Sequence, residues 1–192
     1  SLWAAQRPGR LAGLALNSPW IALWGPTGYS SVLLPPLHAL ARRDPLTELR
    51  LVDPGDRYAS CVHASMHGEW DYDLALKSTG RVPIRVGWAR AILLGQRRVA
   101  RGLGVGVPIF MACSTRSYLR AGGYSRRART SDIVLDVENM AARAPLLGGH
   151  VTLVRIEDGF HDLTLSVPAA RSVYLAELSR WLGTYVPDAI AL

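Results

Sequence analysis

The sequence is poor in cysteine and holds no long apolar run. Its 192 residues include two cysteines, Cys61 and Cys113, which lie far apart and form no Cys-x-x-Cys pair. This scarcity argues against a disulfide framework and against a four-cysteine zinc site, and we expect a cytoplasmic protein. No signal peptide is visible. No stretch reaches the roughly 18 apolar residues that span a bilayer, so we expect no stable membrane insertion.

Lysine is also nearly absent, because Lys77 is the only one and the formal charge of +7 comes from arginine. A basic chain can indicate nucleic-acid binding. The arginines are scattered, however, and no nucleic-acid motif accompanies the tightest group, Arg126, Arg127 and Arg129. Charge alone is weak evidence for such a partner. We therefore expect no nucleic-acid partner and keep a basic nucleic-acid binder as the weaker alternative.

Hydrophobic residues make up 49% of the chain, enough for a packed core. Two short apolar runs, at 11–16 and 107–113, are typical of strands buried in a parallel sheet, and residues 151–156 are predicted to form a third strand. Helical patterns follow at 136–143 and 168–185, where Pro168 suits the first turn of the second helix. This order predicts an α/β fold in which parallel strands are joined by right-handed crossover helices.

Residues 20–106 differ from the rest of the chain, since proline and glycine are frequent and strand alternation is absent. Two helical stretches, 33–43 and 86–101, lie within them. We predict a mostly helical insertion at 20–106 between two core segments, 1–19 and 107–192. The glycines at Gly102, Gly104 and Gly106 precede a strand, whereas a dinucleotide loop must follow one. We interpret them as a hinge and expect no cofactor.

Functional groups in parallel sheets gather beyond the carboxyl ends of the strands. The sequence places Asn17 and Ser18, residues 114–132 and residues 158–162 there. His161 is suited to act as a general base, and Asp132 would orient it by accepting its Nδ1 proton. Asp132 could equally cap the following helix, a role for which Asp136 is better placed. Local sequence does not show whether Asp132 is the partner of His161 or a helix N-cap.

His63 and His67 are four residues apart, with Glu69 nearby, and would share one face of a helix. A zinc-peptidase helix requires glutamate directly after the first histidine, where this chain has Ala64. A third ligand is not identifiable, so we predict no metal site.

The order strand, Asp-bearing loop, helix, strand, Gly-x-His and amphipathic helix resembles the closing half of the α/β-hydrolase fold. More specifically, the chain resembles the serine aminopeptidase-like and lysophospholipase-like hydrolases, which include the monoacylglycerol lipases. Four segments carry this likeness: Leu-Ala-Leu-Asn-Ser-Pro-Trp at 14–20, His-Gly-Glu-Trp-Asp-Tyr-Asp at 67–73, residues 131–138, and Ile-Glu-Asp-Gly-Phe-His-Asp-Leu at 156–163.

The resemblance implies a serine hydrolase that cleaves a carboxylic ester, such as a lysophospholipid or monoacylglycerol, or an amide. His161 matches the catalytic base, and Asp132 matches the acid, with Asp136 as the fallback. The insertion matches the lid over the acyl site, and a small acyl substrate is the implied partner. Four tryptophans could line an apolar acyl pocket there: Trp20, Trp24, Trp70 and Trp88.

The nucleophile of this family lies in a Gly-x-Ser-x-Gly elbow that precedes the acid and the base. No such elbow occurs in the 192 residues, and the nearest match, around Ser125, lacks the second glycine and follows the insertion. We therefore expect the chain to be the C-terminal portion of a hydrolase, inactive alone, with its nucleophile upstream of Ser1. The alternative is a non-catalytic truncated hydrolase that acts as a binding or interaction module. In either case, an exposed edge beside residues 11–16 would favour self-association.

Overall fold

A three-stranded parallel sheet organises the computed structural model, which describes residues 1–25, 29–49, 56–77, 83–120 and 122–186. The strands are β1 (Leu14–Asn17), β4 (Ile109–Ser114) and β5 (Val151–Ile156), in the order β1-β4-β5. The register pairs Leu14 with Ile109 and Ile109 with Val151, so the three carboxyl ends lie at one edge. This is a mixed α/β architecture with the predicted parallel strands.

The central strand, β4, is fully buried, as its uninterrupted apolar run predicts. The neighbouring strands are only partly covered, and Ala15 in β1 is exposed. The expectation that residues 11–16 form a strand buried on both faces is therefore wrong for β1. Among the described residues β1 and β5 each pair on one side only, and a strand's place in a sheet is not encoded in its own sequence.

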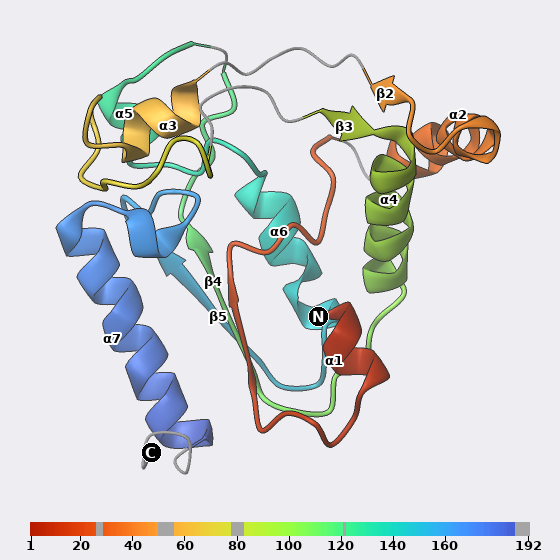
Figure 1. Cartoon of the computed structure of the whole chain (residues 1–192). Helices are drawn as coiled ribbons and strands as arrows, with labels where there is room; N and C mark the ends of the chain where they lie inside the picture. The colour runs from red at the N-terminus through yellow and green to blue at the C-terminus, as the bar shows by residue number, and fades with distance from the viewer. Residues whose placement is uncertain (26–28, 50–55, 78–82, 121, 187–192) are drawn as a thin grey trace.

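Helices cover both faces of the sheet (Figure 1). On one side, α7 (Pro168–Tyr185) places Tyr174 and Trp181 against Phe110. On the other side, α1 (Leu2–Gln6) and α6 (Val137–Arg143) join a cluster that includes Met111 and Met140. Phe110 and Met111 face opposite ways because successive side chains of a strand alternate between the two faces. One-turn 3-10 helices, η1 (Ala144–Leu146) and η2 (Leu163–Leu165), precede β5 and α7.

The segment between β1 and β4 forms two separate groups (Figure 1). In one, α2 (Tyr29–Arg43) packs along α4 (Val86–Ala100), beside the two-residue antiparallel strands β2 (Glu48–Leu49) and β3 (Ile84–Arg85). In the other, α3 (Arg57–Val62) packs around Phe160, which precedes His161, together with α5 (Arg126–Arg129), a helix that follows β4 in the chain. The sequence predicted neither the short strands nor α3 and α5. No described helix is both long and apolar enough to cross a membrane.

Candidate active site

Asp132 and His161 meet beyond the carboxyl ends of β4 and β5. The loop after β4 carries Asp132, whose side chain is fully buried, and the loop after β5 carries His161, whose side chain is 22% exposed. His161 Nδ1 lies 2.9 Å from Asp132 Oδ2. A carboxylate at this distance holds the ring in one orientation and favours the tautomer with its proton on Nδ1.

The second oxygen of Asp132 is held by the backbone. Asp132 Oδ1 accepts hydrogen bonds from the N–H groups of Val134 at 2.8 Å and Leu135 at 2.7 Å. The backbone of Asp132 pairs with the strand-like segment at residues 116–118, which fixes the loop. Because both carboxylate oxygens are satisfied, the buried charge is compensated and the carboxylate is rigidly aimed at His161.

Asp136 has a different role. Its Oδ1 accepts from the N–H groups of Glu138 at 3.0 Å and Asn139 at 3.1 Å, the arrangement of a side-chain N-cap at the start of α6. The structure thus separates the two aspartates that local sequence left equivalent. Asp132 faces the imidazole, and Asp136 stabilises a helix.

The loop that carries His161 is anchored on both sides of the ring. Before it, the N–H of Phe160 donates to Ser166 Oγ at 2.8 Å. After it, Asp162 Oδ1 accepts from Asn17 Nδ2 at 2.7 Å. Asp162 also caps η2 through the N–H of Thr164. The sequence placed Asn17 and Asp162 at this edge of the sheet but gave no sign that they pair across 145 positions.

A cavity of about 350 Å³ adjoins His161. Besides His161, its lining is Ser18, Trp20, Leu23, Trp24, Val134 and Leu135. No described hydroxyl or thiol hydrogen-bonds to the imidazole, whose Nδ1 is occupied by Asp132. The arrangement can therefore bind a small molecule in the cavity and exchange a proton with it through Nε2.

A second cavity, of about 510 Å³ and lined by apolar side chains, lies between α2 and α4. It shares Trp20 and Leu23 with the first cavity, and the rings of Trp20 and Trp88 are 5.7 Å apart. Three of the four tryptophans named from sequence, Trp20, Trp24 and Trp88, line one of these cavities or both. Trp70 does not, because it packs near Phe160 with Arg171 over its ring.

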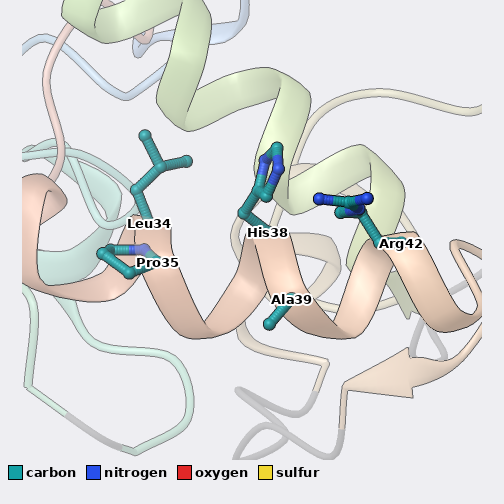
Figure 2. A pocket seen from close by; sticks show the side chains of 5 residues that line it. All are labelled: Leu34, Pro35, His38, Ala39 and Arg42. Atoms are coloured by element: carbon teal, nitrogen blue, oxygen red, sulfur yellow. The ribbon is translucent and has the colours of Figure 1, made fainter.

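A third hollow, of about 580 Å³, is lined entirely by residues of α2 (Figure 2). Its lining is Leu34, Pro35, His38, Ala39 and Arg42. His38 Nδ1 accepts a hydrogen bond from Arg90 Nε at 2.9 Å, which ties α2 to α4. No carboxylate of the described residues hydrogen-bonds to His38, so this hollow does not reproduce the arrangement at His161.

The other sequence candidates have structural roles. His63 is buried, with Nδ1 at 2.8 Å from Ser65 Oγ and Nε2 at 3.1 Å from the carbonyl oxygen of Tyr72. His67 stacks on Tyr124. Within the described part of the chain no three His, Cys, Asp or Glu side chains are arranged to hold a metal. Ser125, the nearest match to an elbow serine, caps α5 by accepting from Ala128 N at 3.0 Å.

Comparison with solved structures supports the fold. The chain is similar to a monoacylglycerol lipase from Paleococcus ferrophilus, with a TM-score of 0.60 and 15% sequence identity. The match covers 95% of this chain but only 63% of the lipase chain. No family model matches the sequence, and no curated protein matches it either. At this identity the likeness establishes the architecture, which is a partial α/β-hydrolase fold.

Proposed function

We propose that this chain is part of a serine hydrolase in which His161 is the general base and Asp132 is the acid that orients it. The contact of 2.9 Å between His161 Nδ1 and Asp132 Oδ2 carries this proposal. The pair lies at the edge of the sheet where α/β proteins place their sites, next to a cavity lined by His161 itself. A serine outside residues 1–192 supplies the nucleophile.

The chemistry follows from the orientation of the ring. His161 Nε2 removes the proton of the serine hydroxyl as its oxygen attacks the substrate carbonyl, and Asp132 stabilises the imidazolium that forms. The imidazolium then gives its proton to the departing alcohol or amine, which leaves an acyl-enzyme. Water repeats the cycle with His161 again as base and releases the carboxylic acid.

The substrate class is an ester with an apolar acyl chain, of the monoacylglycerol or lysophospholipid kind, with an amide as the second choice. The apolar cavity between α2 and α4 supports this choice because it shares Trp20 and Leu23 with the cavity beside His161. A chain bound there would bury its apolar surface while its carbonyl group remains near the imidazole. In this proposal residues 20–106 act as the lid of the core formed by residues 1–19 and 107–192.

The competing function is a non-catalytic binding module built on the same fold. The coding sequence upstream of Ser1 separates the two. A Gly-x-Ser-x-Gly elbow about half a dozen residues before Ser1 supports the enzyme. A start codon directly before Ser1 supports the binding module.

The activity is tested with p-nitrophenyl octanoate and two proteins, the 192-residue chain and the product of the complete reading frame. We expect the complete product to hydrolyse the ester and to react with a fluorophosphonate at an upstream serine. The chain alone should do neither. His161→Ala in the complete product should abolish turnover. A complete product that is inactive toward esters and amides, or a His161→Ala variant with undiminished turnover, would contradict the proposal.

Two physical properties accompany this proposal. The apolar edge at β1 should promote self-association of the isolated chain. Sedimentation tests this, and a clean monomer would contradict it.

We place the protein in the cytoplasm, where free thiols persist, since Cys61 and Cys113 are both unpaired and buried. Thiol titration of denatured protein purified from cells without reductant should find two free thiols.

A further inference from the structure

Ser18 combines two features that its role in the fold does not explain. It follows β1 directly and adopts a left-handed backbone conformation with φ of 43°, which is uncommon for a residue other than glycine. Its backbone N–H is satisfied by the carbonyl of Ala112 at 2.8 Å. Its hydroxyl, in contrast, has no hydrogen-bond partner among the described residues, although Ser18 is only 5% exposed.

Both features are unfavourable in the absence of a ligand. A left-handed residue and an unpaired buried hydroxyl each destabilise the folded state, and such positions gather at binding and catalytic sites. Ser18 lines the same cavity as His161. The other lining residues are aromatic or aliphatic, and among them only the indole N–H groups of Trp20 and Trp24 can hydrogen-bond, as donors. Ser18 is therefore the hydroxyl of this cavity, able both to donate and to accept.

We propose that Ser18 is a specificity residue whose hydroxyl hydrogen-bonds to a hydroxyl group of the substrate in the cavity beside His161. A serine hydroxyl both donates and accepts, and so does an alcohol, which makes the two groups complementary. The ligand class is therefore an acyl ester that carries a free hydroxyl, with its acyl chain in the neighbouring apolar cavity. This inference rests on the proposed function, because it takes the cavity beside His161 as the substrate site.

Ser131 offers a matched control. Its buried hydroxyl also has no partner in the part of the chain that the structure describes, but Ser131 does not line the cavity. Replacement of either serine by alanine removes a hydroxyl that makes no hydrogen bond in the protein. Neither Ser18→Ala nor Ser131→Ala should therefore lower the melting temperature, and both variants should remain folded for comparison.

The test measures binding to the 192-residue chain, which requires no nucleophile. The probes are 1-octanoylglycerol, which has free hydroxyl groups, and methyl octanoate, which has the same acyl chain and none. Calorimetry should show tighter binding of the glyceride to the wild-type chain. Ser18→Ala should weaken glyceride binding by about fivefold to tenfold and change methyl ester binding less than about twofold. Ser131→Ala should leave both affinities unchanged.

Three results would overturn the inference. The first is an absence of binding by the wild-type chain, and the second is an equal effect of Ser18→Ala on both probes, including no effect on either. The third is fluorophosphonate labelling of Ser18, which would make it a nucleophile instead. Hydrolysis by the complete reading-frame product is a separate readout. Its failure with Ser18-dependent binding intact would refute the proposed function and leave the binding role of Ser18 standing.

Discussion

The side chain of Asn17 ties the end of β1 to the residues that follow His161. Asn17 Nδ2 donates to Asp162 Oδ1 at 2.7 Å, and Asn17 Oδ1 accepts from the N–H of Leu163 at 3.1 Å. One amide therefore satisfies a carboxylate and a backbone group of the same loop. Because His161 directly precedes Asp162, this pair of hydrogen bonds positions the imidazole relative to the sheet.

Asn17→Ala should loosen the His161 loop. The substitution leaves the part-buried Asp162 carboxylate without its amide donor, so the free energy of unfolding should fall by about 1–3 kcal/mol, as measured by urea denaturation. In the active, complete protein kcat should fall as well. Asn139→Ala is the control, since Asn139 also bridges two groups, Gly25 and Asp136, but does not contact the His161 loop. An equal effect of both variants on kcat would show that Asn17 acts only through stability.

Arg129 should contribute far more to stability than an exposed arginine does. Its side chain is 6% exposed, and its guanidinium donates to the carbonyl of Leu165 at 2.8 Å and to Glu69 at 3.3 Å. Arg129→Ala removes a buried guanidinium and its charge-assisted hydrogen bonds, and should lower the free energy of unfolding by about 3 kcal/mol. Arg180, which is 70% exposed and paired with Glu177, is the matched control.

Arg180→Ala should cost less than about 1 kcal/mol, because exposed ion pairs are screened by solvent. Urea denaturation at one pH and one salt concentration compares the two variants. Similar losses for both would contradict the structural role assigned to Arg129.

Burial of the Cys113 thiol should make the protein less stable in alkali. Burial raises the pKa of Cys113 to about 11 from an ordinary value near 9. Above about pH 9 the thiol ionises in the unfolded chain but stays protonated in the folded one, which favours unfolding. The buried, protonated thiol therefore stabilises the fold fully at a pH below its pKa in the unfolded chain. This stabilisation is lost as the pH rises through the pKa of the thiol in the folded protein.

Urea denaturation at about pH 8 and pH 10 checks this. The stability of the wild type should fall by about 1 kcal/mol more than that of Cys113→Ala over this interval. Tyrosines whose pKa burial also raises, such as Tyr58 and Tyr174, are common to both proteins and cancel in the comparison. If the wild type and Cys113→Ala lost the same free energy of unfolding between these pH values, the raised pKa of Cys113 would be contradicted.

The sequence predicted β5 and α7 with the bounds that the structure has. Both signals are local, since valine, leucine and isoleucine fill four of the six positions at 151–156 and Pro168 marks the first turn of a long helix. It missed α3 and α5, which have six and four residues and are too short to show a helical period. Their positions depend on packing around Phe160, a contact between segments far apart in the chain.

Contacts between distant segments also limit what the sequence predicts about the site. The sequence placed Asp132 and His161 at the correct edge of the sheet but could not distinguish Asp132 from Asp136, because either aspartate can cap a helix. Only the fold shows which carboxylate faces His161. The unpaired hydroxyl of Ser18 and the pairing of Asn17 with Asp162 were also inaccessible, because each depends on groups from distant segments.

The central claim is that Asp132, and not Asp136, orients the catalytic imidazole. The direct measurement is kcat for p-nitrophenyl octanoate with Asp132→Asn and Asp136→Asn in the complete reading-frame product. Asp132→Asn retains the shape of the side chain but favours the wrong tautomer of His161, so kcat should fall on the order of 10⁴-fold. Asp136→Asn preserves a good N-cap and should change kcat less than about threefold. Full activity of Asp132→Asn, or a comparable loss with Asp136→Asn, would contradict the account.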